Sequence, residues 1–151
     1  MSDHWITLVP EDPRFIPDLA KQNTARDRFA EIAPEVEEIE LIASDEVKFF
    51  DCGENFSHVC CPSCHSEVPL QWWTDRMDED SAPVGFKLKT YSTPCCGKNF
   101  TLNELVYRWT QAFGCFALNA MNPDIGELQD GHKRELEELL GTKLKVIYQH
   151  I

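Results

Sequence analysis

Two short stretches, VCCPSC at residues 59–64 and TPCCGKNF at residues 93–100, hold five of the seven cysteines in this chain of 151 residues. Cysteines in this arrangement can form a metal clip, a redox couple or a disulfide. The N-terminal sequence MSDHWITLVP has neither the basic nor the apolar region of a signal peptide, so we expect the protein in the cytoplasm. Because thiols stay reduced there, a disulfide framework is disfavoured.

The spacing of the cysteines favours a zinc site. In the turn Cys61-Pro-Ser-Cys64, two thiolates can face one ion while backbone N–H groups donate to the sulfur atoms. Cys95-Cys96-Gly97 is the only candidate for a second pair, and it looks like a C-x-x-C-G knuckle contracted to adjacent cysteines. We predict one structural zinc ion with four ligands, Cys61, Cys64, Cys95 and Cys96. Such a site is closed to water and substrate, so it stabilises structure and does not catalyse.

Other assignments of these residues stay open. Cys60, His58 and His65 are alternatives for the fourth ligand, although Cys60 would point away from the metal in an extended segment. The five thiols could also lie in the core or at the surface without a metal. A redox couple is the weaker alternative, because no thioredoxin-like β-α-β unit precedes the C-x-x-C motif. Cys52 could act as a nucleophile with His58, but its acidic neighbours suppress the thiolate and favour a core thiol.

Hydrophobic periodicity and helix-capping residues predict an α+β chain. We expect strands at residues 5–10, 37–43, 46–56, 85–92, 113–123 and 143–151, and helices at residues 17–33, 69–80, 101–109 and 130–141. The helix at residues 101–109 has the clearest start, because Thr101 and Glu104 form a capping box. The order predicts a single domain over residues 1–151, in which two β-α-β units flank a zinc-ribbon-like insertion at about residues 57–100. No segment approaches the roughly 20 apolar residues of a membrane span.

The negative charge of the chain is concentrated in its first half. The formal net charge is −12, and residues 1–80 hold 19 acidic against 6 basic side chains, whereas residues 81–151 hold 7 against 8. Such a surface repels phosphate backbones, so nucleic-acid binding is disfavoured, and it attracts basic proteins. The alternative is that the charge serves only solubility.

The helix expected at residues 69–80 carries the candidate partner-binding surface. Adjacent helical residues point about 100° apart, so both tryptophans are buried only if the helix is covered over a wide arc. An exposed tryptophan beside acids would anchor a basic partner, whereas two buried ones would belong to the core. The candidate residues are Trp72, Trp73, Asp75, Asp78, Glu79 and Asp80.

The order of the motifs resembles that in a family of small bacterial proteins with a zinc-ribbon-containing segment. The shared motifs are DCGENF at 51–56, CPSC at 61–64, WW at 72–73, PCCG at 94–97 and LNEL at 102–105. The resemblance covers roughly residues 45–151 and implies no established activity. More loosely, the chain is similar in size and charge to immunity proteins, which neutralise bacterial toxins and are small, acidic and non-catalytic.

From these features we expect a non-enzymatic protein-binding module, specifically an immunity protein that occludes the active site of a basic cognate toxin. One alternative is a zinc-ribbon adaptor in a transcription or translation assembly. A second is a zinc metalloenzyme in which one of Cys95 and Cys96 leaves an open coordination position. No nucleic-acid or membrane partner is expected, and the sequence leaves the oligomeric state open.

Overall fold

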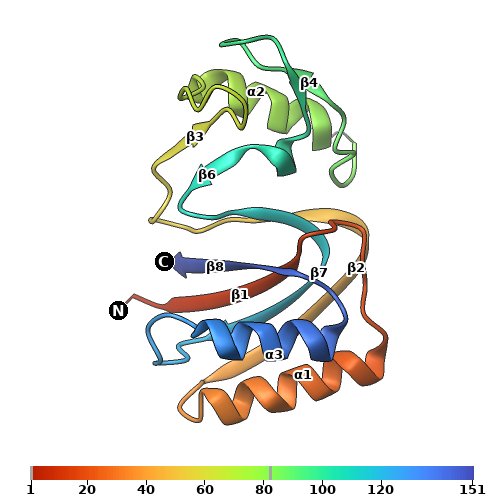
Figure 1. The fold of residues 1–151 in the computed structure, drawn as a ribbon, viewed down its shortest axis with the longest axis vertical. Coiled ribbons are helices and arrows are strands. Elements are labelled where there is room, and N and C mark those ends of the chain that lie inside the picture. The colour runs from red at the N-terminus through yellow and green to blue at the C-terminus, as the bar shows by residue number, and fades with distance from the viewer. Residues whose placement is uncertain (1, 82) are drawn as a thin grey trace.

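A four-stranded antiparallel sheet carries the N- and C-terminal parts of the chain in the computed structural model, which describes residues 2–81 and 83–151 (Figure 1). Its spatial order is β2 (Glu38–Phe50), β7 (Ala112–Met121), β1 (His4–Pro10) and β8 (Leu144–His150). Helix α1 (Leu19–Ile32) joins β1 to β2, and α3 (Asp130–Leu140) joins β7 to β8. Each helix thus connects two parallel strands with another strand between them, which is the split β-α-β arrangement. The α+β prediction is confirmed.

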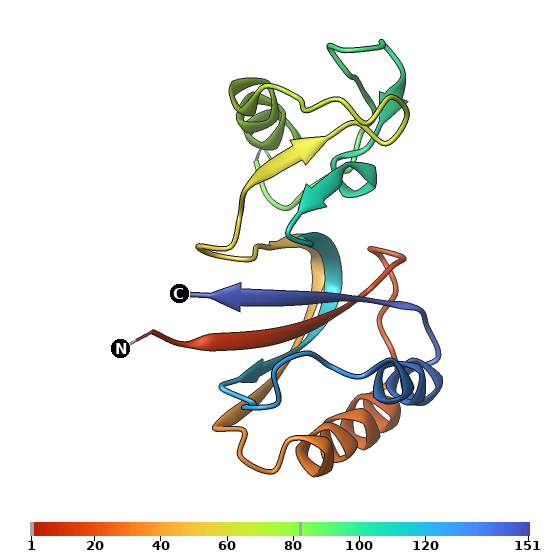
Figure 2. The same ribbon diagram turned by 60° about the vertical axis from the view of Figure 1, so that its left-hand side comes forward.

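The connection between β2 and β7, residues 51–111, holds the cysteine-rich part of the chain, and we call it the insertion. Its elements are β3 (His58–Cys60), α2 (Leu70–Ser81), β4 (Tyr91–Ser92), β5 (Asn99–Phe100), the 3₁₀ helix η1 (Leu102–Glu104) and β6 (Val106–Arg108). Strands β3 and β6 form one small antiparallel sheet, and β4 and β5 form another. Figures 1 and 2 show the insertion and the α1–α3 pair at opposite ends of the molecule, with the main sheet between them.

The two helices cover one face of the main sheet because each has a buried apolar stripe. Phe29 of α1 and Leu136 of α3 are fully buried against β-strand residues such as Phe116. The Arg28 guanidinium donates to both carboxylate oxygens of Glu135, at 2.7 and 3.1 Å, and so ties α1 to α3. This cluster forms the larger hydrophobic core of the molecule.

Strand β7 connects this core to that of the insertion. Its side chains alternate between faces, so Phe116 faces the helices while Phe113 lies in a second cluster. That second cluster contains Val59, Leu102 and Tyr107 of the insertion. The insertion is therefore packed on the sheet through a shared core and is not a free appendage.

The DCGENF segment crosses to the opposite edge of the sheet and runs beside β8. The backbone N–H of Glu54 donates to the carbonyl of His150 at 2.8 Å, and the Asn55 side chain donates to the carbonyl of Tyr148 at 2.9 Å. Gly53 has φ +63°, and a Cβ there would collide with the His150 carbonyl, so glycine is required. Cys52 is fully buried, and burial beside Asp51 raises the pKa of its thiol to about 11, which makes it a core residue.

Four expected elements differ in the structure. The helix expected at 101–109 is a single 3₁₀ turn followed by strand β6, because pairing with β3 places Tyr107 in the core of the insertion. The strand expected at 37–43 and the first part of the strand expected at 46–56 form one strand, β2, with an irregularity between Ala43 and Lys48, and residues 51–56 lie outside it. Of the strand expected at 85–92, only Tyr91 and Ser92 form a strand, β4, and Phe86 makes an isolated bridge to Val47 of β2. No helix in the described ranges is long and apolar enough to cross a membrane.

Candidate metal centre

Two tight turns of the insertion bring Cys61, Cys64, Cys95 and Cys96 together. Their four sulfur atoms all lie within 4.8 Å of one another, with 3.7 Å between Cys61 and Cys96 and 3.3 Å between Cys64 and Cys95. A tetrahedral zinc site with Zn–S bonds of about 2.3 Å has sulfur atoms about 3.8 Å apart. The cluster therefore fits one structural metal ion of the zinc type.

The two turns have the same backbone hydrogen bonds. In the first, the Cys61 N–H donates to Ser66 at 2.8 Å, and the His65 N–H donates to Cys61 at 3.0 Å. In the second, the N–H of Thr93 donates to Lys98 at 3.0 Å, and the N–H of Gly97 donates to Thr93 at 2.9 Å. Thr93 thus occupies the position that Cys61 has in the first turn. The sequence predicted a contracted second knuckle, and this prediction is wrong. The second knuckle has full length, with threonine at its first ligand position.

Thr93 has no thiol, so a neighbouring cysteine supplies the sulfur ligand in its place. Its side chain is 2% exposed, and its Oγ1 lies 3.5 Å from the sulfur of Cys96 and 3.7 Å from that of Cys61. A hydroxyl at this distance can donate a hydrogen bond to a thiolate and so help to orient that metal ligand. Cys95, at the third position of the turn, supplies the fourth sulfur atom. The equivalence of the two turns is visible in the sequence, because Pro62 and Pro94 each stand two residues before a cysteine.

The turn backbone stabilises thiolates before any metal contributes. Hydrogen bonds from the backbone N–H groups of Cys64 and Ser63 lower the pKa of the Cys61 thiol to about 6. The hydrogen bond with the Cys64 thiol and burial raise the pKa of Cys95 to about 11. Cys61 and Cys95 thus are not both thiolates at neutral pH in the metal-free protein. A divalent cation displaces the remaining protons, so metal affinity falls as pH falls.

The three alternative ligands lie outside the cluster. Within residues 2–81 and 83–151, the group that can share one ion contains neither Cys60, His58 nor His65. Cys60 is on β3 opposite Val106, and the His58 ring bonds to the Ser57 hydroxyl at 2.8 Å. His65 has φ +63°, at the position that Gly97 occupies in the second turn.

The equivalent positions His65 and Gly97 give a matched pair of predictions. Both have positive φ, at +63° and +73°, and a Cβ on Gly97 would meet no atom within 4 Å. Gly97→Ala should therefore lower the free energy of unfolding of the metal-loaded protein by about 1 kcal/mol through backbone strain alone. His65→Gly should raise it by a similar amount or leave it unchanged. Urea unfolding measures both, and a more stable Gly97→Ala variant would contradict this assignment.

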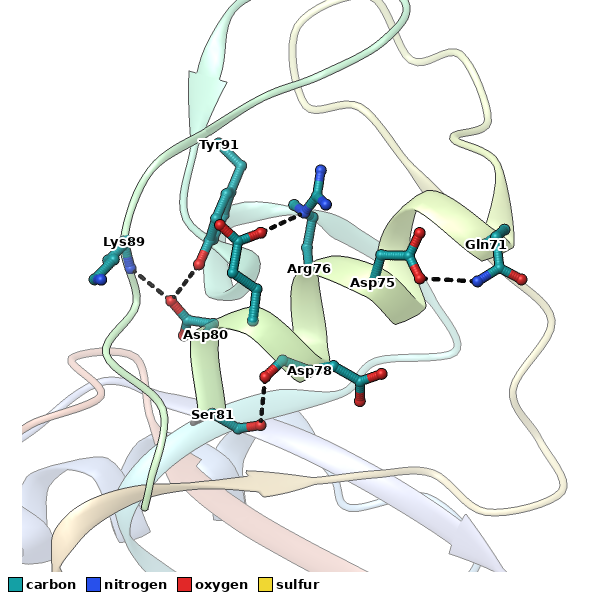
Figure 3. Close-up of polar contacts among 9 residues, drawn as sticks. Gln71, Asp75, Arg76, Asp78, Asp80, Ser81, Lys89 and Tyr91 are labelled. Carbon is teal, nitrogen blue, oxygen red and sulfur yellow. Dashed lines mark hydrogen bonds and ion pairs between the residues drawn. The ribbon is translucent and has the colours of Figure 1, made fainter. Parts of the chain in front are cut away.

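The acids predicted to bind a partner have two different environments on α2 (Figure 3). Asp75, Asp78 and Glu79 are exposed, and Glu79 pairs with Arg76 at 3.0 Å. Asp80 is 1% exposed, because its carboxylate accepts hydrogen bonds from the segment that follows α2. Asp80 is thus a structural residue, whereas the exposed acids are available to a partner.

The two tryptophans of α2 are half-buried in the core of the insertion. Trp73 stacks on Phe56 with ring centroids 5.5 Å apart, and its Nε1–H donates to the Tyr107 hydroxyl at 3.1 Å. The guanidinium of Arg76 lies over the Trp72 ring, 5.8 Å from its centroid. Core packing accounts for both rings, which weakens their role as anchors for a partner.

Comparison with known proteins assigns no family to the chain. No family model, curated protein or solved structure matches it. The four-cysteine cluster, which could bind a metal ion, is therefore the functional feature that its own structure identifies.

Proposed function

We propose that this chain is a non-enzymatic module that binds a basic protein and is held rigid by one structural zinc ion. The observation that carries the proposal is the cluster of four thiols within 4.8 Å of one another. Four thiolates complete the tetrahedral coordination of zinc, so no position is left for a water molecule or a substrate. The same argument disfavours a zinc metalloenzyme.

The charge of the chain supports a basic partner. With 26 acidic against 14 basic side chains, the protein repels polyanions and accelerates encounters with proteins of opposite charge. On α2 the exposed acids Asp75, Asp78 and Glu79 point away from the core that the two tryptophans fill. A rigid acidic surface of this kind loses little conformational entropy on binding.

The specific form of this function that we propose is toxin neutralisation by an immunity protein. It rests on small size, negative charge and a closed metal site. The mechanism is occlusion, in which the acidic surface covers a basic active-site cleft of the toxin. Charge steers the encounter and a few buried contacts set the dissociation rate.

Co-expression with the products of neighbouring genes tests this proposal. A cognate toxin should form a stable 1:1 complex with the tagged protein, and co-expression should restore growth to cells that the toxin alone arrests. The association rate should fall steeply as salt rises, because screening weakens the steering. If no neighbouring product forms a complex and none is toxic, the immunity proposal is wrong.

The pair of equivalent cysteine turns favours a second candidate, a zinc-ribbon adaptor in a transcription or translation assembly. Two hairpin-borne turns around one ion are a common way to build a small rigid docking module. This candidate predicts co-purification with polymerase subunits or ribosomal proteins instead of a single toxin. Mass spectrometry of the co-purified proteins distinguishes the two.

A further inference from the structure

A cavity of about 570 Å³ lies at one end of the main sheet, and Asn55 of the insertion is part of its lining. The start of β1, the end of β8, the loop after β7 and the residues before β2 line it. Residues that matter for its chemistry are His4, Trp5, Glu35, Glu37, Asp124 and Tyr148. The volume is in the range of sites that bind small molecules or single side chains of a partner.

The wall of the cavity is held by specific hydrogen bonds. Asn122, which has φ +47°, exchanges backbone and side-chain hydrogen bonds with His4, at 2.6 and 2.9 Å. Its Nδ2 donates to the carboxylates of Asp3 and Glu37, each at 3.1 Å. The Tyr148 hydroxyl accepts the N–H of Leu128 at 2.9 Å. These contacts fix the wall before a ligand binds.

The lining is acidic, and its basic residue is His4, whose ring stacks on that of His150 with centroids 4.5 Å apart. Glu35, Glu37 and Asp124 are exposed carboxylates, and neither lysine nor arginine lines the cavity. Among the described residues, none of these three acids forms an ion pair with a lysine or arginine. Glu54, 3.5 Å from His150, adds a further carboxylate close to the end of β8. The cavity therefore favours a cation.

The acids of the cavity do not gather around one point as the ligands of a metal ion do. Of the residues that the structure describes, only the four cysteines form a group of three or more ligands close enough to share an ion. Carboxylates that are further apart suit a cation whose charge and donors are spread over several atoms. Apolar surface from Ile6 and Pro123, with the rings of Trp5 and Tyr148 in the lining, suits the alkyl stem of such a cation.

We propose that this cavity binds an alkylguanidinium or alkylammonium group. The inference deepens the proposed function and rests on it for the source of the group, which is an arginine or lysine side chain of the basic partner. A free polyamine has the same chemistry and is the other source. The carboxylates of Glu37 and Asp124 bind the charged end, and the apolar lining contacts the stem.

The test is a titration of the isolated metal-loaded protein followed by the indole N–H signal of Trp5, assigned with a Trp5→Phe variant. The probes are N-acetyl-arginine methylamide, spermidine and the neutral isostere N-acetyl-citrulline methylamide. We expect saturable shifts of Trp5 with at least one cation, none with the citrulline compound, and no change in the signals of Trp72 and Trp73. Equal binding of the citrulline compound, or no Trp5 shift with either cation, would overturn the inference.

Charge-matched variants show whether the cavity or the overall charge is responsible. Glu37→Gln and Asp124→Asn each remove one lining carboxylate, and Glu138→Gln removes an exposed carboxylate of α3. Each lining variant should lower the affinity of the protein for the cation by about tenfold, whereas Glu138→Gln should leave that affinity unchanged. Equal losses in all three variants would overturn the inference.

The two sources of the cation predict different results. If the partner supplies it, the lining variants weaken the purified complex while spermidine competes poorly. If a polyamine is the natural ligand, spermidine binds more tightly than the arginine compound and the complex tolerates the variants. The titration needs no partner, so the two proposals can fail independently. If the cavity binds no cation, a measured 1:1 complex still supports the proposed function. If no complex forms, the titration still tests the cavity.

Discussion

Replacement of Cys61 by serine is expected to abolish zinc retention and to unfold the insertion, and to destabilise the main sheet through the core that Phe113 shares with the insertion. Cys61 is fully buried, whereas Cys64, Cys95 and Cys96 are exposed, so its loss removes the buried one of the four ligands. Structural zinc sites contribute about 10–16 kcal/mol of binding free energy, which is comparable to the whole stability of a domain. Metal analysis and the amide spectrum of the insertion measure the effect.

Chelation of the metal from the unmodified protein should give the same spectrum. Cys60→Ser is the matched control, because this cysteine adjoins Cys61 but lies outside the cluster. It should retain one zinc ion per chain and change the free energy of unfolding by less than about 1 kcal/mol. A Cys61→Ser variant that keeps its zinc and its stability would contradict the assignment, as would zinc loss in Cys60→Ser.

Substitution of Asp80 by asparagine is expected to destabilise the insertion by about 3 kcal/mol, the second-largest effect that we predict. One carboxylate oxygen of Asp80 accepts the N–H of Leu88 at 2.8 Å. The other accepts the N–H of Lys89 at 3.0 Å and the hydroxyl of Tyr91 at 2.8 Å (Figure 3). An amide cannot accept on both sides, so at least one buried donor loses its partner. Urea unfolding of the zinc-loaded protein measures the loss.

Two variants separate this network from the general effect of negative charge. Tyr91→Phe removes one of the three hydrogen bonds and should cost about 1 kcal/mol. Asp78→Asn removes an exposed carboxylate of the same helix and should change stability by less than about 0.5 kcal/mol. If Asp80→Asn were no more costly than Asp78→Asn, the carboxylate would not organise the segment after α2.

Local sequence patterns predicted the main sheet and its helices because those elements agree with their tertiary setting. The 3.6-residue pattern of Leu136 and Leu140 and the stop at Gly141, with φ +77°, define α3 without outside information. The capping box at Thr101 is also real, since Glu104 accepts the N–H of Thr101 at 2.8 Å. The helix nevertheless ends after one turn, because the chain gains more by pairing β6 with β3 than by continuing the helix.

The cysteine cluster could be predicted because ligand spacing is a local property, whereas the setting of the other candidate residues is not. The sequence does not distinguish Asp80 from its exposed neighbour Glu79. Asp80 is buried because residues 88–91 fold back against it and donate hydrogen bonds to its carboxylate. Trp109, which follows β6, is 54% exposed, whereas the two tryptophans of α2 that were candidates for exposure are half-buried. The acidic cavity joins residues near positions 5, 37, 124 and 148, a combination that only the sheet order creates.

X-ray absorption spectroscopy on the protein purified with its native metal tests the central claim most directly. The account predicts one zinc ion per chain with four sulfur ligands at about 2.3 Å and no nitrogen or oxygen in the first coordination sphere. That result would establish the closed site from which the non-catalytic role follows. A folded chain without metal, or a zinc ion with three sulfur ligands and one light-atom ligand, would contradict it and favour a metalloenzyme in the second case.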